Sequence, residues 1–226
     1  ISGIPNYIRC TDGVYNNDAL YNMLMRLPVY NPPPAEYKGE PVVGIRGEVF
    51  ANVKTLRKVV LPDTIKEIRG GAFTNASNLE EINLPEGIPE IKGETFQGCS
   101  SLKEITIPDS VTSMAMTFHQ CGNLTGTIPN IPNSVTDMCN TFYNCSKLTG
   151  NVPNIPDSVT NMHRTFYNCN NLTGTIPNIP NSVTDISYTF LSCNLTGTIP
   201  NIPNSVTDMS GTFHNCYNIT GTIPNI

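Results

Sequence analysis

The sequence predicts a repeat solenoid, an elongated molecule in which similar coils of chain stack one on another. The clearest sign is that every phenylalanine of the 226-residue chain occupies one phase of a recurring segment, with steps of 22 to 24 residues. A second sign is the string NSVTDMCNTFYNC at residues 133–145, which returns in similar form until the end of the chain. A fixed period of this length is typical of solenoids and arrays. The phenylalanines are Phe50, Phe73, Phe96, Phe118, Phe142, Phe166, Phe190 and Phe213.

A residue type confined to one phase of a repeat has one structural role, so we expect the phenylalanines to form the core. Six of them are followed three residues later by a cysteine, where earlier copies have Val53 and Ala76. A position that accepts valine, alanine or cysteine favours a small buried apolar group, which predicts free thiols rather than disulfides or metal ligands. These core cysteines are Cys99, Cys121, Cys145, Cys169, Cys193 and Cys216.

Charge and hydropathy argue against nucleic acid as a partner and against a membrane-spanning segment. Charged residues make up only 14% of the chain and the net charge is −5, so the chain lacks the basic surface that binds phosphate backbones. No apolar run approaches the ~18 residues of a membrane span, and the opening ISGIPNYIRC does not resemble a secretion signal. We expect neither nucleic acid nor a membrane span, and any export signal or anchor to be absent from this chain.

Residues 1–41 do not follow the repeat and predict an N-terminal capping segment. A helix at about 17–27 is expected, because its apolar residues recur at the spacing of one helix face and Pro28 follows them. The proline-rich stretch 31–41 predicts an extended connector. An open solenoid end exposes its apolar interior, so this segment is expected to cover the first coil. The apolar residues of the predicted helix are Leu20, Met23, Leu24 and Leu27.

Residues 42–226 contain about eight copies of the repeat. Early copies share an L-x-x-[IV]-x-[IL]-P segment, which predicts a short strand with Leu102, Ile105 and Ile107 facing inward. The chain then turns and passes through a short helical turn that carries the phenylalanine and the cysteine. From Leu124 the first segment becomes LTGTIPNIP, and its prolines cannot donate to a β-ladder. A β-rich solenoid with short strands and a less regular sheet in its second half is therefore expected.

The last copy, ITGTIPNI, stops before its second half. Open solenoid ends leave backbone groups and apolar side chains without a neighbouring coil. We therefore expect either that the natural chain continues past Ile226 or that the protein self-associates through its C-terminal coil.

The segments L-x-x-I-x-I-P, S-V-T-x-[IM] and T-F-x-x-C resemble the BspA-like leucine-rich repeats of the Treponema pallidum type, over about residues 42–226. The resemblance implies a curved right-handed solenoid with short strands on its concave and convex sides. It also implies a cell-surface or secreted protein of host-associated bacteria or some protists, used for adhesion to host proteins or other cells. The family has no shared catalytic residues, so the resemblance implies no enzymatic activity and no cofactor.

Equivalent residues of successive coils lie side by side, so each phase of the repeat becomes a stripe on the surface. The stripe that follows the phenylalanine is rich in aromatic residues, which would suit a protein or sugar ligand. The alternative is that each ring packs on its neighbour and shields the edge of the solenoid. The candidate binding residues are His119, Tyr143, Tyr167 and His214, and Leu191 lies in the same phase.

A second stripe is partly acidic. A calcium ion between Asp185 and Asp208 is conceivable, but solvent screening makes two exposed aspartates tolerable without a metal, and no metal is expected. The stripe consists of Ser113, Asp137, Asn161, Asp185 and Asp208.

Cys139 and His163 share one phase on adjacent coils, and Ser187 follows them. A nucleophilic cysteine needs a base, an orienting partner and an oxyanion site beside a pocket. The sequence offers only the base, so a plain surface position is the favoured interpretation.

The sequence therefore predicts a non-enzymatic interaction or adhesion module, outside the cell or on its surface, that binds a macromolecule of a host or neighbouring cell. The expected partner is a host or cell-surface protein. The alternative is a carbohydrate-binding module in which the Tyr and His stripe forms a stacking platform for a glycan.

Overall fold

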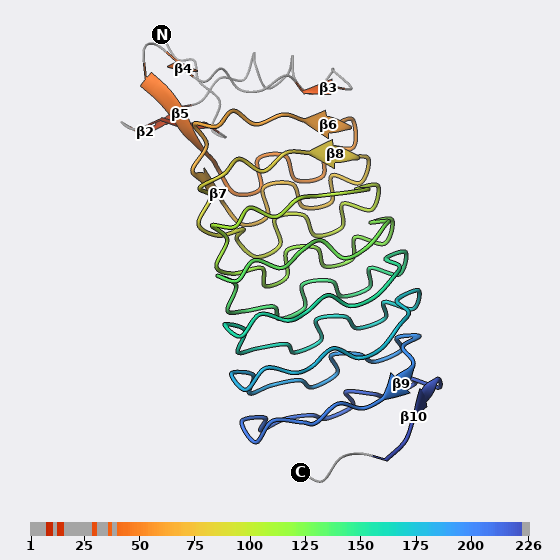
Figure 1. Ribbon diagram of the computed structural model, residues 1–226. Coiled ribbons are helices and arrows are strands. Elements are labelled where there is room, and N and C mark those ends of the chain that lie inside the picture. The colour runs from red at the N-terminus through yellow and green to blue at the C-terminus, as the bar shows by residue number, and fades with distance from the viewer. Residues whose placement is uncertain (1–7, 11–12, 16–28, 31–35, 38–39, 223–226) are drawn as a thin grey trace.

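The computed structural model describes residues 8–10, 13–15, 29–30, 36–37 and 40–222, and it shows a solenoid of stacked coils (Figure 1). Within these residues the chain forms strands, isolated bridges and turns, and no helix. The predicted β-rich solenoid is confirmed. The predicted helix at 17–27 lies outside the described residues, and the helical turns expected at the phenylalanines are wrong.

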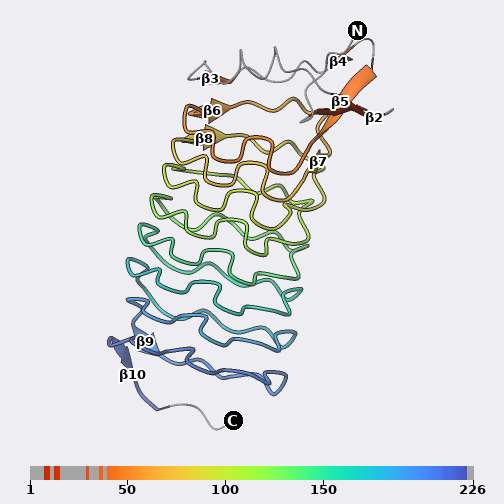
Figure 2. The same cartoon turned by 180° about the vertical axis from the view of Figure 1, so that it is seen from behind.

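Three short sheets join neighbouring coils. The first has the order β2-β1-β5-β4 with β7 paired to β5, the second has the order β3-β6-β8, and the third pairs β9 with β10. Both views of the molecule place β6, β8, β9 and β10 along one side of the stack, and β5 and β7 along the other (Figures 1 and 2). The strands are β1 (Ile8–Cys10), β2 (Gly13–Tyr15), β3 (Val29–Tyr30), β4 (Glu36–Tyr37), β5 (Glu40–Ile45), β6 (Lys58–Val59), β7 (Glu67–Ile68), β8 (Glu81–Ile82), β9 (Gly197–Thr198) and β10 (Ile219–Thr220).

The N-terminal strands are attached to the first coils through two of these sheets. Strand β1 pairs antiparallel with β5, and β3 pairs parallel with β6. Strand β5 crosses the boundary predicted at residues 41 and 42. What the structure describes of the N-terminal segment is therefore extended chain that continues the ladders of the solenoid.

The segment around each phenylalanine is a series of turns because two of its residues have a left-handed backbone. In one coil these are Met116 (φ 57°) and Gln120 (φ 63°), two residues before and two after Phe118. Some N–H groups bond within the coil, as Cys121 does to the Phe118 carbonyl at 3.1 Å. Others bond to the next coil, as Phe118 does to the Thr141 carbonyl at 3.0 Å. A helix would direct all of these N–H groups into its own coil, so the left-handed residues exchange helical bonds for bonds between coils.

The phenylalanine rings form one continuous stack through the core. Neighbouring ring centroids are 5.2 to 6.1 Å apart and the rings are within 10° of parallel. The rings from Phe73 to Phe190 are fully buried, whereas Phe213 in the last described coil is partly exposed. Each ring therefore depends on the coils before and after it for its burial.

The core cysteines form a second ladder beside the rings. The Cys145 thiol donates a hydrogen bond to the carbonyl oxygen of Phe118 in the preceding coil at 3.1 Å, and the other five repeat this contact. Burial raises the pKa of the Cys99 thiol to about 12, so the thiol stays protonated and remains a donor. The structure describes seven cysteines as free thiols: Cys99, Cys121, Cys139, Cys145, Cys169, Cys193 and Cys216.

The sheet on the L-x-x-I side is regular only at its start. Strands β6 and β8 pair in parallel, but beyond them the coils are joined by isolated bridges such as Thr127 to Thr149 until β9 and β10. The loss of regularity begins at residues 102–108, one coil before the first LTGTIPNIP segment, and β9 and β10 lie within copies of that segment, so the prolines alone do not explain it. It also leaves the middle of this side without a continuous sheet.

Candidate functional site

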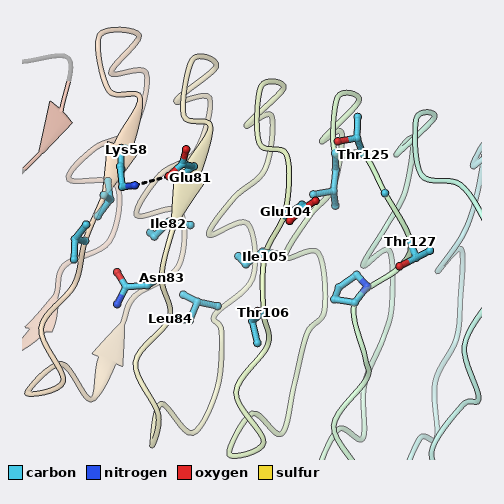
Figure 3. Close-up of a pocket in the computed structure, with 15 residues that line it drawn as sticks. Lys58, Glu81, Ile82, Asn83, Leu84, Glu104, Ile105, Thr106, Thr125 and Thr127 are labelled. Atoms are coloured by element: carbon cyan, nitrogen blue, oxygen red, sulfur yellow. Dashed lines mark hydrogen bonds and ion pairs between the residues drawn. The ribbon is translucent and has the colours of Figure 1, made fainter.

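A groove of about 830 Å³ crosses this side of the solenoid between β6 and the coil that begins at Leu124 (Figure 3). Ile82 is buried beneath it, while Leu84 and Ile105 are only partly buried. Val60 is 40% exposed and lies in the lining. The groove therefore has an apolar floor that remains in contact with solvent.

The groove lies where the repeat changes its length. From the inward leucine to the turn proline, the early coils have seven residues, as in 102–108, and the later coils have nine, as in 124–132. The longer segment bends at Gly126, where φ is +80°. Thr125, Gly126 and Thr127 line the groove at this point. The first long segment therefore bounds a groove whose floor is made by shorter segments.

The glycine at the third position of the long segment, Gly126 in its first copy, has a different environment there than in the coils that follow. A Cβ atom on Gly150 would lie 3.0 Å from the Cγ2 methyl of Thr127 in the preceding coil, and Gly174, Gly197 and Gly221 are covered in the same way. Nothing lies within 4 Å of such an atom at Gly126, because the preceding coil has a short segment. An open slot therefore lies above Gly126.

Two rows of charged residues cross the early coils beside the groove. In the first row, Glu80 lies 3.0 Å from Arg57 and 2.5 Å from Lys103. The hydrogen bond and charge of Lys103, with a smaller contribution from Arg57, lower the pKa of Glu80. The first row thus alternates positive, negative, positive.

The second row ends without its counter-ion. Lys58 Nζ lies 2.5 Å from Glu81 Oε2, and Glu104 follows on the next coil (Figure 3). Glu104 is exposed and forms no ion pair within the part of the chain that the structure describes. The next residue of this row is Gly126, so one carboxylate at the groove faces an empty position.

The structure stacks three of the four candidate aromatic residues. The rings of His119 and Tyr143 have centroids 4.7 Å apart, and those of Tyr143 and Tyr167 are 4.5 Å apart. Leu191 is buried on the next coil, and His214 is exposed one coil further on. Burial lowers the pKa of His119. Because each ring covers the face of its neighbour, this stripe presents mainly ring edges to solvent.

The acidic stripe has a structural explanation. Asp137 Oδ1 accepts the N–H of Cys139 at 2.9 Å, and Asp208 Oδ1 accepts that of Ser210 at 2.8 Å. In the same way, Asn161 Oδ1 accepts the N–H of His163, and Asp185 Oδ1 accepts the N–H of Ser187. Such bonds are a common reason for Asp and Asn in turns. The described residues include no group of three or more His, Cys, Asp or Glu that could hold a metal ion.

Cys139 and His163 have different hydrogen-bond partners. His163 Nδ1 lies 2.6 Å from Ser187 Oγ, and that hydroxyl donates to Asp185 Oδ1 at 2.6 Å. The Cys139 sulfur accepts a bond from Asn140 Nδ2 at 3.0 Å. Burial, together with the charge of Asp137, raises the pKa of Cys139. A thiol with a raised pKa is a poor nucleophile, so this row lacks the features of an activated cysteine.

Comparison with known proteins agrees with the repeat and the fold. The family model described as the BspA type leucine rich repeat region matches in six copies, over residues 40–149 and 138–224. The chain belongs to this family. No curated protein matches the sequence.

Solved structures of bacterial leucine-rich repeat proteins share the fold of this BspA-type chain. The Treponema pallidum leucine-rich repeat protein is 30% identical, with a TM-score of 0.62 over 72% of this chain and 75% of that one. A Bacteroides ovatus protein is 25% identical, with a TM-score of 0.58 over 80% and 53%. A Eubacterium ventriosum protein, 23% identical with a TM-score of 0.51 over 77% and 47%, supports the fold alone.

The groove residues of this BspA-type protein were missed by reasoning from the sequence. The available signal was the change from L-x-x-I-x-I-P to LTGTIPNIP at Leu124, which adds two residues to a segment held between fixed inward positions. By itself the change predicts only a less regular sheet, because the pattern of one coil does not show how it packs against a coil of different length. Within the described chain there is also no helix with the length and apolar character that a membrane span requires.

Proposed function

We propose that this BspA-type protein is a non-enzymatic interaction module, secreted or held at the cell surface, that binds a protein of a host or neighbouring cell. The observation that carries the proposal is the groove beside β8. Val60, Leu84 and Ile105 leave apolar surface exposed there. The residues in the same phases as Leu84 and Ile105 on neighbouring coils are buried, namely Leu61, Ile107, Val59 and Ile82. Exposed apolar surface with a polar and charged rim is typical of protein-binding sites.

The aromatic stripe supports the glycan alternative less well than it supports a structural role. A sugar-stacking platform needs free ring faces, and both faces of Tyr143 are covered by His119 and Tyr167. The buried His119 Nδ1 has no hydrogen-bond partner, and it is not available to solvent. We therefore favour a protein ligand over a carbohydrate.

The proposal is tested by capture of partners from host extracellular matrix on the immobilised protein. The wild type is compared with Val60→Glu, which places a charge on the apolar floor. The matched control is Tyr217→Glu, because Tyr217 is the other large hydrophobic residue exposed in the described chain, 87% exposed and far from the groove. Capture of a protein by the wild type and the control, and its loss in Val60→Glu, is the expected result.

Two results would contradict the proposal. Equal capture by all three proteins would show that binding does not use the groove. Selective binding on a glycan array that disappears in Tyr143→Ala and Tyr167→Ala would establish the carbohydrate-binding alternative instead.

A further inference from the structure

We infer, on the basis of the proposed function, that the groove binds an extended segment of its partner protein with a lysine or arginine placed over Gly126 and paired with Glu104. Three features of the groove carry this inference: the unpaired carboxylate, the open slot and the length of the apolar floor.

The charge pattern of the neighbouring rows favours a cation beside Glu104. In the row of Arg57, Glu80 and Lys103, the single carboxylate lies between two cations. In the neighbouring row, Lys58 is already paired with Glu81, which leaves Glu104 as a carboxylate without a counter-ion in the described chain. Complementary charge at a groove selects partners and fixes their register. A basic side chain from the partner would complete the second row.

The slot over Gly126 gives that side chain a place to lie. In the following coils the same glycine is covered by a threonine or asparagine of the preceding coil, such as Thr127 over Gly150 or Asn151 over Gly174. The fold thus provides, coil after coil, a position in which a side chain lies across this glycine. Gly126 has no such cover. The aliphatic stem of a lysine or arginine can lie on the glycine while its charged end reaches the carboxylate.

The apolar floor extends the contact along the solenoid. The lining includes residues of four successive coils, from Lys58 to Pro129. With coils ~4.8 Å apart, the floor is about 14 Å long, which is the length of roughly four residues of extended chain. Alternate side chains of an extended segment point to the same side. A basic residue over Gly126 therefore predicts an apolar residue two positions away, in contact with Ile105 or Leu84.

The first experiment selects random seven-residue peptides, displayed on phage, against the immobilised full chain. Wild type is compared with Glu104→Gln, and with Glu86→Gln as a control that removes the same charge. Glu86 is exposed, lies outside the groove, and also forms no ion pair in the described chain. We expect lysine or arginine with an apolar residue two positions away to be enriched on the wild type and on Glu86→Gln. The basic residue is expected to lose its enrichment on Glu104→Gln.

The second experiment measures the affinity of the best synthetic peptide by fluorescence anisotropy. Replacing its basic residue by norleucine should weaken binding to the wild type by roughly 2- to 5-fold, as for an exposed ion pair. The same replacement should change little on Glu104→Gln, whose thermal unfolding should match that of the wild type because the substituted side chain is exposed and unpaired.

The outcomes separate this inference from the proposed function. Selected peptides without a basic residue, or an equal loss of affinity on wild type and Glu104→Gln, would overturn the pairing with Glu104. Failure to select any peptide would overturn the extended segment as ligand. In each of these cases, loss of matrix capture in Val60→Glu would still support the interaction module.

Discussion

At the scale of single residues, the core cysteines do more than fill space. In earlier coils, Val53 and Ala76 occupy the position of these cysteines and are also buried. The six cysteines add a thiol donor to a carbonyl of the preceding coil, as Cys145 does to Phe118. Such bonds are weak individually, but each one joins two adjacent coils at the centre of the stack.

This ladder predicts that the protein loses stability in alkaline solution. Burial raises the pKa of Cys99 to about 12 and shifts the other core thiols in the same direction. Above the ordinary thiol pKa of about 8.5 the unfolded chain loses protons that the folded chain keeps, so the free energy of unfolding falls as the pH rises. Each buried thiol adds a slope of about 1.4 kcal/mol per pH unit over this window, up to its folded pKa.

Urea unfolding at pH 7 to 11 measures this slope. In Cys99→Ala the free energy of unfolding should fall less steeply with pH, by about 1.4 kcal/mol per pH unit above pH 9.5, because one titrating thiol is removed from the unfolded state. An unchanged slope in this variant would show that the buried thiols do not control alkaline stability.

Adjacent aromatic residues should differ strongly in their contribution to stability. Phe166 is fully buried, with Phe142 and Phe190 stacked 5.8 Å away on its two sides, so Phe166→Ala should cost about 3 to 5 kcal/mol. Tyr167 is half-buried in the edge stripe, and Tyr167→Ala should cost only about 1 to 2 kcal/mol. Chemical denaturation measures both values. Equal shifts of the two midpoints would contradict the assigned phase of the repeat.

At the scale of the element, the paired left-handed residues define the turn around each phenylalanine. Asn168 illustrates the requirement, since its φ is +56° and its N–H donates to the Leu191 carbonyl at 2.9 Å. Asparagine tolerates this conformation better than other residues with a Cβ atom. The frequent asparagines two residues after the phenylalanines therefore have a backbone role.

Substitution at Asn168 tests this role. Asn168→Val should cost about 1 to 2 kcal/mol, because a β-branched side chain is strained at positive φ. Asn168→Gly removes the strain and the 2.9 Å bond to Asn144 Oδ1, so a cost below about 1 kcal/mol is expected. Thermal unfolding of the two variants gives the comparison, and a glycine variant as unstable as the valine variant would assign the asparagine a side-chain role instead.

At the scale of the whole molecule, each coil contacts mainly its neighbours along the stack (Figures 1 and 2). The hydrogen bonds between coils repeat with the period of the sequence, as in Phe118 to Thr141 and Phe142 to Thr165. A molecule built in this way should tolerate the loss of one complete repeat, since the coils on each side of the deletion can pack together.

Removal of residues 137–160, one full period, should leave a folded protein with an intact groove, because the groove lies within residues 58–129. Its denaturant m-value should fall by roughly a tenth, in proportion to the surface removed. Removal of residues 137–148 joins two phases that do not match and should unfold the coils that follow. Far-UV circular dichroism during denaturation distinguishes the two deletions, and equal loss of structure in both would contradict a modular solenoid.

The architecture of this protein can be predicted from the period of its sequence. A phenylalanine every 22 to 24 residues and a cysteine three residues later predict stacked coils with one apolar interior, and the structure buries these residues in that way at Phe142 and Cys145. The prediction succeeds because burial acts on the same phase in every coil. Periodic hydrophobicity is a strong signal when neighbouring copies share one environment.

The places where the repeat departs from its regular form depend on contacts between coils. The turns replace helices because bonds to the next coil compete with bonds inside the coil, and that competition depends on a neighbour about 24 residues away. The groove arises because a short segment packs beside a longer one, which leaves Gly126 uncovered and Glu104 unpaired in the described chain. These features depend on the contact between unlike coils, and the pattern of a single coil does not contain that contact.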